Sequence, residues 1–198
     1  MTDAIHVSAD GDGDGDAHAI ITTERLDLIL LSAEEVLAYA DVRPGVDLLG
    51  SQPFANPYGF FVDDIGPLRH RIPQLLANPK VNPWLVHVIV ERSSRTAIGI
   101  ANFHDSPDEN GVVEIGYRIA PPKRRQGFAR ETTIGMFRWA LHDSRVRTFR
   151  ASISPGNVAS RHLVETLGLT EVGLQEDPED GPEIIYEIGA AEFAARFT

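Results

Sequence analysis

Cysteine is absent from this 198-residue sequence, which excludes disulfides, thiolate metal sites and a cysteine nucleophile. No apolar run approaches the roughly 20 residues of a membrane helix, and the N-terminus has neither the basic nor the hydrophobic region of a secretory signal. Positive charge is scarce, since 18 lysines and arginines stand against 29 acidic residues and the formal net charge is −11. We therefore predict a cytoplasmic protein that binds no membrane. We also predict that it binds no nucleic acid, because phosphate backbones are held by an excess of positive charge.

Residues 1–19 also lack lysine and arginine, although they contain several aspartates. Low hydrophobicity with charge of one sign predicts a disordered acidic tail. The run "DGDGDGD" spaces its acids as a calcium loop does, but Ile21 stands where such a loop needs a closing glutamate. We therefore expect no metal site. The 42% of hydrophobic residues are enough for one domain with a proper core, over residues 20–198.

Apolar and polar residues alternate in several segments that are rich in β-branched residues and separated by turn sequences, which predicts strands. The expected strands are 20–31, 84–91, 97–104, 112–119, 148–153, 169–174 and 183–188. Other segments have helical spacing or helix caps. Ser32 is a natural N-cap, and Gly168 suits a left-handed helix end. The expected helices are 33–40, 67–77, 128–143, 157–167 and 190–197.

A basic loop, "PPKRRQGFARE", lies between the strand 112–119 and the next helix. The first amides of a helix have no intrahelical partners and lie at the positive end of its dipole, so they bind anions. Gly127 allows a sharp turn and a close approach to a ligand. Residues 125–129 could then present consecutive N–H groups to a pyrophosphate, with Lys123, Arg124 or Arg130 reaching an outer phosphate. The alternative is a solvated basic turn before an ordinary amphipathic helix.

The segment "RRQGFA" fits the Arg/Gln-x-x-Gly-x-Gly/Ala loop of the GNAT (Gcn5-related) N-acetyltransferases, with Arg124, Gly127 and Ala129 at the defining places. Four further segments occur in the order expected of the RimJ/RimL-type branch: "TTERLDL", "EIGYRIAP", "SPGNVASRHLVETLGL" and "EIIYEI". From about residue 20 to residue 188 the chain therefore resembles this family. The resemblance implies an α/β fold, with a mixed, mostly antiparallel sheet of about seven strands flanked by helices.

The resemblance also implies a function, which is the transfer of an acetyl group from acetyl-CoA directly to a primary amine, on a protein N-terminus or a small molecule. It implies that the backbones of Tyr117 and Ile119 bind the pantetheine arm or the acetyl carbonyl. Asn157 is implied to contact the pantetheine arm, and Ser160 to face the thioester sulfur. The full set of implied cofactor-binding residues is Tyr117, Ile119, Arg124, Arg125, Gln126, Gly127, Phe128, Ala129, Arg130, Asn157 and Ser160.

Glu114 is the candidate general base, because an amine must lose a proton before it can attack a thioester. Alternation places Glu114 on one strand face with Gly116, which leaves room for a ligand. The alternative is that Glu114 only pairs with Arg118 or with a cation on a neighbouring strand. In many GNAT enzymes a tyrosine acts as the general acid at the position that Val164 occupies in this chain. Ser160 or water is therefore left to protonate the CoA thiolate, although helix capping explains part of the presence of Asn157 and Ser160.

The acceptor side is less defined by the sequence. The segment 41–66 contains four aromatic residues, which could grip an acceptor or pack the segment onto the core. His104, at a strand end, could line the acceptor side, but ordinary surface or core packing is the simpler interpretation. Three alternatives to the enzyme stay open: a catalytically silent acyl-CoA-binding module, use of another acyl-CoA donor such as succinyl-CoA, and an interaction protein whose basic loop docks an acidic partner. A homodimer is compatible with the resemblance.

Overall fold

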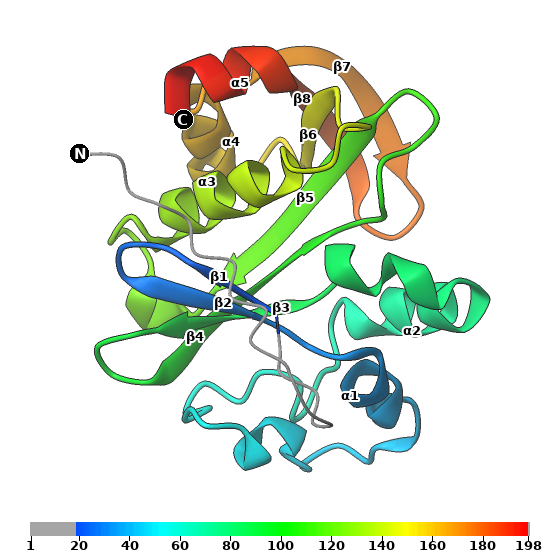
Figure 1. The fold of residues 1–198 in the computed structure, drawn as a ribbon, viewed down its shortest axis with the longest axis vertical. Helices are drawn as coiled ribbons and strands as arrows, with labels where there is room; N and C mark the ends of the chain where they lie inside the picture. The colour runs from blue at the N-terminus through cyan, green and yellow to red at the C-terminus, as the bar shows by residue number, and fades with distance from the viewer. Residues whose placement is uncertain (1–18, 198) are drawn as a thin grey trace. The chain divides into compact units, whose positions relative to one another are not determined.

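The computed structural model describes residues 19–197 (Figure 1). These residues form two compact units. The first unit comprises the described residues up to Asn102 together with Tyr117–Gly135. The second comprises Phe103–Gly116 and the described residues from Met136 onward. The predicted tail, residues 1–19, lies outside the described residues except for Ala19. The carbonyl of Ala19 accepts a hydrogen bond from Leu30 N at 3.0 Å.

Eight strands form a mixed, mostly antiparallel sheet, in the order β1-β2-β3-β4-β5-β6-β8-β7. The prediction of about seven strands was short by one, because residues 20–31 form a hairpin of two strands instead of a single strand. The bounds are β1 Ile20–Thr22, β2 Leu26–Leu30, β3 His87–Glu91, β4 Thr96–Phe103, β5 Val112–Ile119, β6 Thr148–Ile153, β7 Thr170–Asp177 and β8 Gly181–Gly189.

In the first unit, β1 to β4 are joined by antiparallel pairings (Figure 1). The helices of this unit are α1 Ala33–Ala38 and α2 Leu68–Ala77, with short 3₁₀ turns η1 Tyr39–Asp41, η2 Leu48–Ser51, η3 Pro79–Trp84 and η4 Pro121–Lys123. Ser32 caps α1 as predicted, in a capping box with Glu35. The expected strand at 84–91 begins only at His87, because Trp84 belongs to η3.

The aromatic residues of segment 41–66 mostly belong to the core of the first unit. Phe54, Phe60 and Phe61 are all less than a tenth exposed, whereas Tyr58 is half-buried. Of the two interpretations of this segment, the structure therefore supports packing onto the core for these three rings.

In the second unit, the N-terminal part of β5 pairs in parallel with β6, and β6, β8 and β7 pair in antiparallel fashion. The helices are α4 Val158–Thr166, α5 Ala190–Phe197 and the end of α3 Phe128–Ala140. The rings of Phe137, Phe149 and Phe193 pack against one another with centroids 4.1 to 5.3 Å apart. They fill the core beneath the inward faces of β6 and β8. Gly168 ends α4 in the left-handed region as predicted, with φ of 92°.

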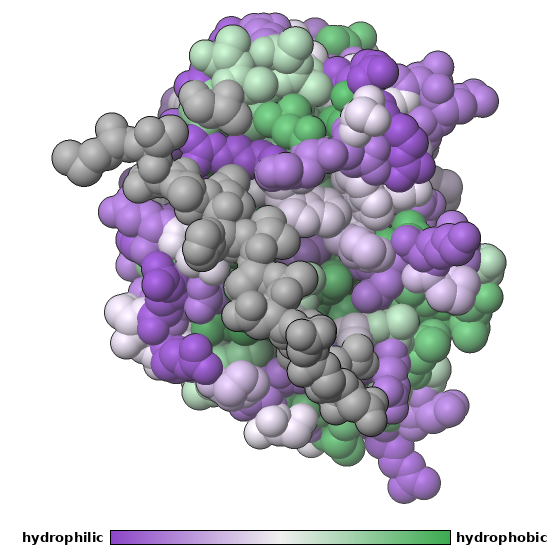
Figure 2. Space-filling view, viewed as in Figure 1, coloured by the Kyte–Doolittle hydropathy of each residue, from purple (hydrophilic) through white to green (hydrophobic). Residues whose placement is uncertain are grey.

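The described surface is predominantly hydrophilic on the face that Figure 2 shows. Among the described residues, no helix has both the length and the apolar character needed to cross a membrane.

Candidate active site

The basic loop of the first unit runs from the end of β5 to the start of α3. The Ala120 N–H donates to the carbonyl of Ile98 at 2.8 Å, which is the last sheet contact before the two prolines. A turn closes with Lys123 N donating to Ala120 O, at 2.8 Å. Arg125 and Gly127 then adopt positive φ angles of 60° and 83°. Two left-handed residues so close together bend the backbone sharply into the first turn of α3.

Five consecutive backbone amides, those of residues 125–129, have no hydrogen-bond acceptor within the described part of the chain. At this end of α3, Glu131 N donates to the carbonyl of Gly127, at 3.0 Å. The N–H groups of residues 125–129 are therefore left for water or a ligand. A run of unpaired amides at a helix N-terminus is the environment that a phosphate group prefers, so the residues present fit the pyrophosphate expected from the sequence.

The cations of the loop differ in their availability. Lys123 is held by Glu91, with Nζ 2.7 Å from the carboxylate oxygen. The hydrogen bond from Lys123, followed by that from Ser94, keeps the pKa of the Glu91 carboxyl below its usual range. Arg124 Nε donates to the carbonyl of Ile119 at 3.0 Å, which fixes the loop to the end of β5. The side chain of Arg125 is exposed.

A brace that the sequence did not indicate supports the loop from β1–β2. The Glu131 carboxylate accepts hydrogen bonds from Thr23 Oγ1 at 2.6 Å, from Arg25 N at 2.7 Å and from Arg25 Nε at 2.7 Å. Arg25 in turn donates to the carbonyl of Gln126 at 3.0 Å, and its guanidinium lies 4.5 Å from the centroid of Phe128. Arg25 thus contacts the loop on both sides of Gly127. The partners are more than 100 residues apart in sequence, so no local pattern could have revealed them.

The predicted base, Glu114, lies in the second unit and is mostly buried, with 18% of its side chain exposed. Its Oε1 lies 3.6 Å from Nδ1 of His104, whose side chain is 49% exposed. The expected alternative partner, Arg118, belongs to the first unit, where its guanidinium lies over the ring of Phe60. Of the two pairings considered from the sequence, the structure therefore supports the one with a neighbouring strand. The partner of Glu114 is His104, which is a cation only when protonated.

Other charged groups lie on the same sheet face of the second unit as Glu114. Arg150 is the register partner of Glu114 on β6, but both Nε and Nη2 of Arg150 bond Glu187, at 2.8 and 2.6 Å. Burial raises the pKa of the Glu183 carboxyl above its usual range; a hydrogen bond from Gln175 opposes this rise, and nearby negative charges, including that of Glu114, add to it. Glu114 therefore lies on a face that carries both the Arg150–Glu187 ion pair and the carboxyl of Glu183.

Asn157 and Ser160 lie in the second unit at the start of α4. Asn157 is the N-cap, and its Oδ1 accepts from Ser160 N at 3.2 Å, so the predicted capping role is confirmed for this pair. The Asn157 amide group and the Ser160 hydroxyl have no further protein partner among the described residues. The amide N–H groups of Asn157 and the hydroxyl of Ser160 are therefore available to hydrogen-bond a ligand while the cap is in place. Val164 is fully buried. Its hydrocarbon side chain cannot act as an acid at this helix position.

Tyr117 and Ile119 belong to the first unit, together with the loop. Ile119 is buried, and Tyr117 is half-buried. The backbones of β4 and β5 approach closely here, because a Cβ on Gly99 would lie 2.5 Å from the carbonyl of Arg118. Sequence reasoning did not single out Gly99, although a glycine within an otherwise β-branched strand is a recognised sign of close backbone approach.

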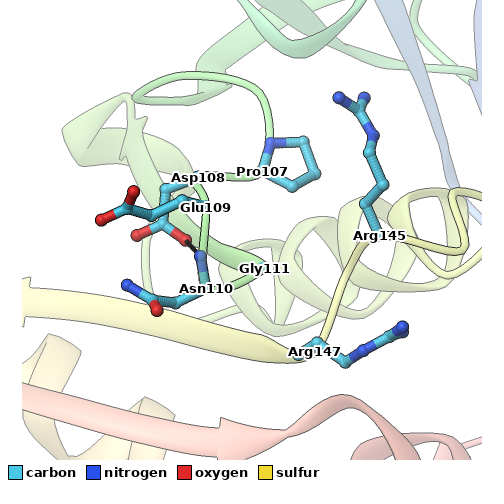
Figure 3. A pocket seen from close by; sticks show the side chains of 7 residues that line it. All are labelled: Pro107, Asp108, Glu109, Asn110, Gly111, Arg145 and Arg147. Atoms are coloured by element: carbon cyan, nitrogen blue, oxygen red, sulfur yellow. Dashed lines mark hydrogen bonds between the residues drawn. The ribbon is translucent and has the colours of Figure 1, made fainter.

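A shallow hollow of about 520 Å³ in the second unit is lined by Pro107, Asp108, Glu109, Asn110, Gly111, Arg145 and Arg147 (Figure 3). Its charged side chains do not converge, since both arginines extend away from the two carboxylates (Figure 3). Arg145 is paired with Asp143 at 2.7 Å. Within residues 19–197, no group of three or more His, Cys, Asp or Glu side chains is arranged to hold a metal ion.

A family model described as an acetyltransferase (GNAT) domain matches residues 63–170. This match covers more than half of the chain, and the protein therefore belongs to the GNAT acetyltransferase family. A curated relative, the uncharacterized N-acetyltransferase YjdG of Bacillus subtilis, is 32% identical over 81 residues, which is 41% of this chain and 48% of YjdG. The chain spans about half the length of the curated relatives it matches.

Solved structures share the fold. A Vibrio cholerae protein described as a ribosomal-protein-serine acetyltransferase superposes with a TM-score of 0.58 at 18% identity, covering 86% of this chain and 97% of that protein. The microcin C7 self-immunity acetyltransferase MccE, solved with acetyl-CoA and AMP, superposes with a TM-score of 0.56 at 18% identity, covering 84% and 93%. At these identities the likeness extends to the fold, which confirms the predicted α/β class.

Proposed function

We propose that this protein transfers an acetyl group from acetyl-CoA directly to a primary amine. The run of unpaired amides at residues 125–129 carries the proposal, because it fits the pyrophosphate of CoA in a chain that belongs to the GNAT family. The loop residues Arg124 to Arg130 would hold the phosphates, and the backbones of Tyr117 and Ile119 would bind the pantetheine arm or the acetyl carbonyl. Acetyl-CoA would supply the activated thioester.

The residues of the second unit would perform the proton transfers. Glu114 would accept the proton that the amine must lose before attack. Asn157 would donate its amide hydrogens to the pantetheine arm, and the Ser160 hydroxyl would donate to the departing thiolate. Support for these roles is that Glu114 is mostly buried and that the Asn157 amide group and the Ser160 hydroxyl lack further partners in the described part of the chain. No covalent enzyme intermediate is needed, which suits a chain without cysteine.

The acceptor is proposed to be a protein N-terminus or a small-molecule amine, as in the RimJ/RimL-type branch. The likeness to a structure described as a ribosomal-protein-serine acetyltransferase supports this choice at the level of the fold. A homodimer and a cytoplasmic location stay predictions. The second candidate is an acyl-CoA-binding module without catalysis, and the mostly buried carboxylate of Glu114, with Glu183 nearby, favours the enzyme because it suits a cationic acceptor.

A transfer assay separates these functions. The purified protein would be incubated with acetyl-CoA and, in separate reactions, spermidine and peptides that begin with serine or alanine. Free thiol release and the mass of the acceptor would both be followed. Acetylated acceptor with equal thiol release is the expected result. Acetyl-CoA binding without transfer to any amine would favour the acyl-CoA-binding module without catalysis. Transfer from succinyl-CoA alone would show that the acyl donor is succinyl-CoA instead of acetyl-CoA.

A further inference from the structure

We propose that His104 acts through Glu114 as a proton relay and positioning residue, which receives the proton that Glu114 takes from the amine and passes it to water. The proposal rests on the proposed acetyl transfer, and it assigns a role to a histidine that the sequence left as ordinary packing. It depends on the juxtaposition of two residues within the second unit, one directly after β4 and one within β5.

The backbone fixes this juxtaposition. His104 N donates to the carbonyl of Glu114 at 2.8 Å, so the two residues are direct neighbours across the β4–β5 pair. Side chains of such neighbours project from the same sheet face within reach of each other. The 3.6 Å between Nδ1 and Oε1 is longer than a hydrogen bond, and catalytic contacts of this kind commonly tighten when substrate binds. The proximity of the two side chains therefore follows from strand register.

Competition for Glu114 also favours the histidine. The nearest guanidinium on β6, that of Arg150, already bonds Glu187 of β8 through two nitrogens. The charge of Glu183 on β8 interacts with that of Glu114, and Asp177 and Asp180 interact in turn with Glu183. The negative charge of Glu114 stabilises a protonated imidazole on His104 more than a neutral one. The site is thus arranged so that a positive charge arriving on His104 is compensated.

The exposures of the two side chains give the transfer a direction. Glu114 is 18% exposed, whereas His104 is 49% exposed and reaches solvent. In the relay, the ammonium N–H bond breaks as the Glu114 O–H bond forms. That O–H bond then breaks as Nδ1 of His104 is protonated, and the imidazolium releases one proton to water.

The first test is the pH dependence of acetyl transfer by His104→Gln, with His142→Gln as the matched control. His142 is exposed on the same unit, and its Nδ1 lies 3.0 Å from the Trp139 carbonyl oxygen. The acceptor would be spermidine or a serine-initiated peptide, whichever the parent acetylates. At about pH 7 we expect His104→Gln to lower kcat roughly 10-fold, less than the ~10²-fold effect of losing a general base itself. The KM for acetyl-CoA should be unchanged.

Two readouts separate a relay from a structural role. At about pH 9.5 the deficit of His104→Gln should shrink below roughly twofold, because solvent then accepts the proton readily. Imidazole added to the buffer should restore part of the rate of His104→Ala and none of that of His142→Ala. A pH-independent deficit without rescue would overturn the relay and leave only a packing role.

A third measurement needs no acceptor. The imidazole of His104 would be titrated by NMR in the parent and in Glu114→Gln, and its pKa should fall by at least about half a unit when the neighbouring carboxylate is neutralised. An unchanged titration would overturn the pairing. If the parent acetylates an amine and His104→Gln matches it at every pH, the relay fails while the proposed function stands. If the parent acetylates nothing, the proposed function fails and the relay falls with it.

Discussion

Glu131→Ala should destabilise the first unit and weaken the phosphate-binding loop together. The change removes three hydrogen bonds, from Thr23 Oγ1 and from two nitrogens of Arg25. Bonds to a charged group contribute about 1.5 to 3 kcal/mol each when buried. The 43% exposure of the Arg25 side chain screens its share, so we expect a total loss of about 2 kcal/mol. The melting temperature should fall by roughly 4 to 8 °C.

Chemical denaturation in a Trp139→Phe background would report this loss, because Trp84 then emits alone and lies in the same unit as Glu131. The control is Glu192→Ala, which removes an equally short pair, at 2.6 Å, between side chains about half exposed. The control should change the free energy of unfolding by less than about 0.5 kcal/mol. Affinity for acetyl-CoA should fall roughly fivefold in Glu131→Ala alone, since Arg25 no longer positions the loop. Equal losses in both variants would refute the assignment of Glu131 as the brace.

Further substitutions test the remaining roles. Glu114→Gln should lower kcat by roughly 10²-fold and leave acetyl-CoA affinity within a factor of about two. Ser160→Ala should slow turnover about 10-fold at a stability cost below about 0.5 kcal/mol, because the hydroxyl has no partner within residues 19–197. Asn157→Asp should keep the helix cap but reduce acetyl-CoA affinity roughly fivefold, by removing the amide donor. Lys123→Met should destabilise by about 1 kcal/mol at neutral pH, with the difference disappearing in acid.

The pH dependence expected for the stability of Lys123→Met follows from Glu91. Its pKa is lowered in the folded protein by Lys123, so the stabilisation is present above the unfolded pKa and is lost as pH falls through the folded value. Urea denaturation at several pH values measures it, and a difference that grows in acid would contradict the assignment. Steady-state kinetics measures the turnover of Glu114→Gln and Ser160→Ala, and thermal unfolding measures the stability of Ser160→Ala. Calorimetric titration measures the acetyl-CoA affinity of Glu114→Gln and Asn157→Asp. Unchanged turnover of Glu114→Gln across pH would remove it as the base. Normal turnover of Ser160→Ala with a large loss of melting temperature would leave only a structural role.

Local features of the structure followed from local sequence signals. Ser32 and Asn157 cap their helices as predicted, because each has a side-chain oxygen directly before a helical segment. The left-handed end of α4 followed from Gly168, and the strands of the meander followed from alternation closed by a turn at Gly111, whose φ is 77°. The basic loop was found because glycine and cations adjoin a helix start.

Features set by distant contacts could not be predicted in the same way. The turn that divides residues 20–31 into β1 and β2 is held by the carboxylate of Glu131, whose position relative to Thr23 depends on the folded sheet. The neighbour of Glu114 depends on the register of β4 against β5, and one residue of slip would have placed His104 on the other face. Lys123 was one of three candidates in the sequence for reaching an outer phosphate, yet Glu91 on β3 already engages it.

The central claim is that the amides of the loop bind acetyl-CoA, and isothermal titration with acetyl-CoA tests it most directly. The parent would be compared with Gly127→Glu, which places a carboxylate at a residue with φ of 83°, and with Gly189→Glu, where a side chain meets no atom within 4 Å. We predict binding by the parent and by Gly189→Glu and no measurable binding by Gly127→Glu. Equal binding by all three proteins, or no binding by the parent, would contradict the assignment of the loop.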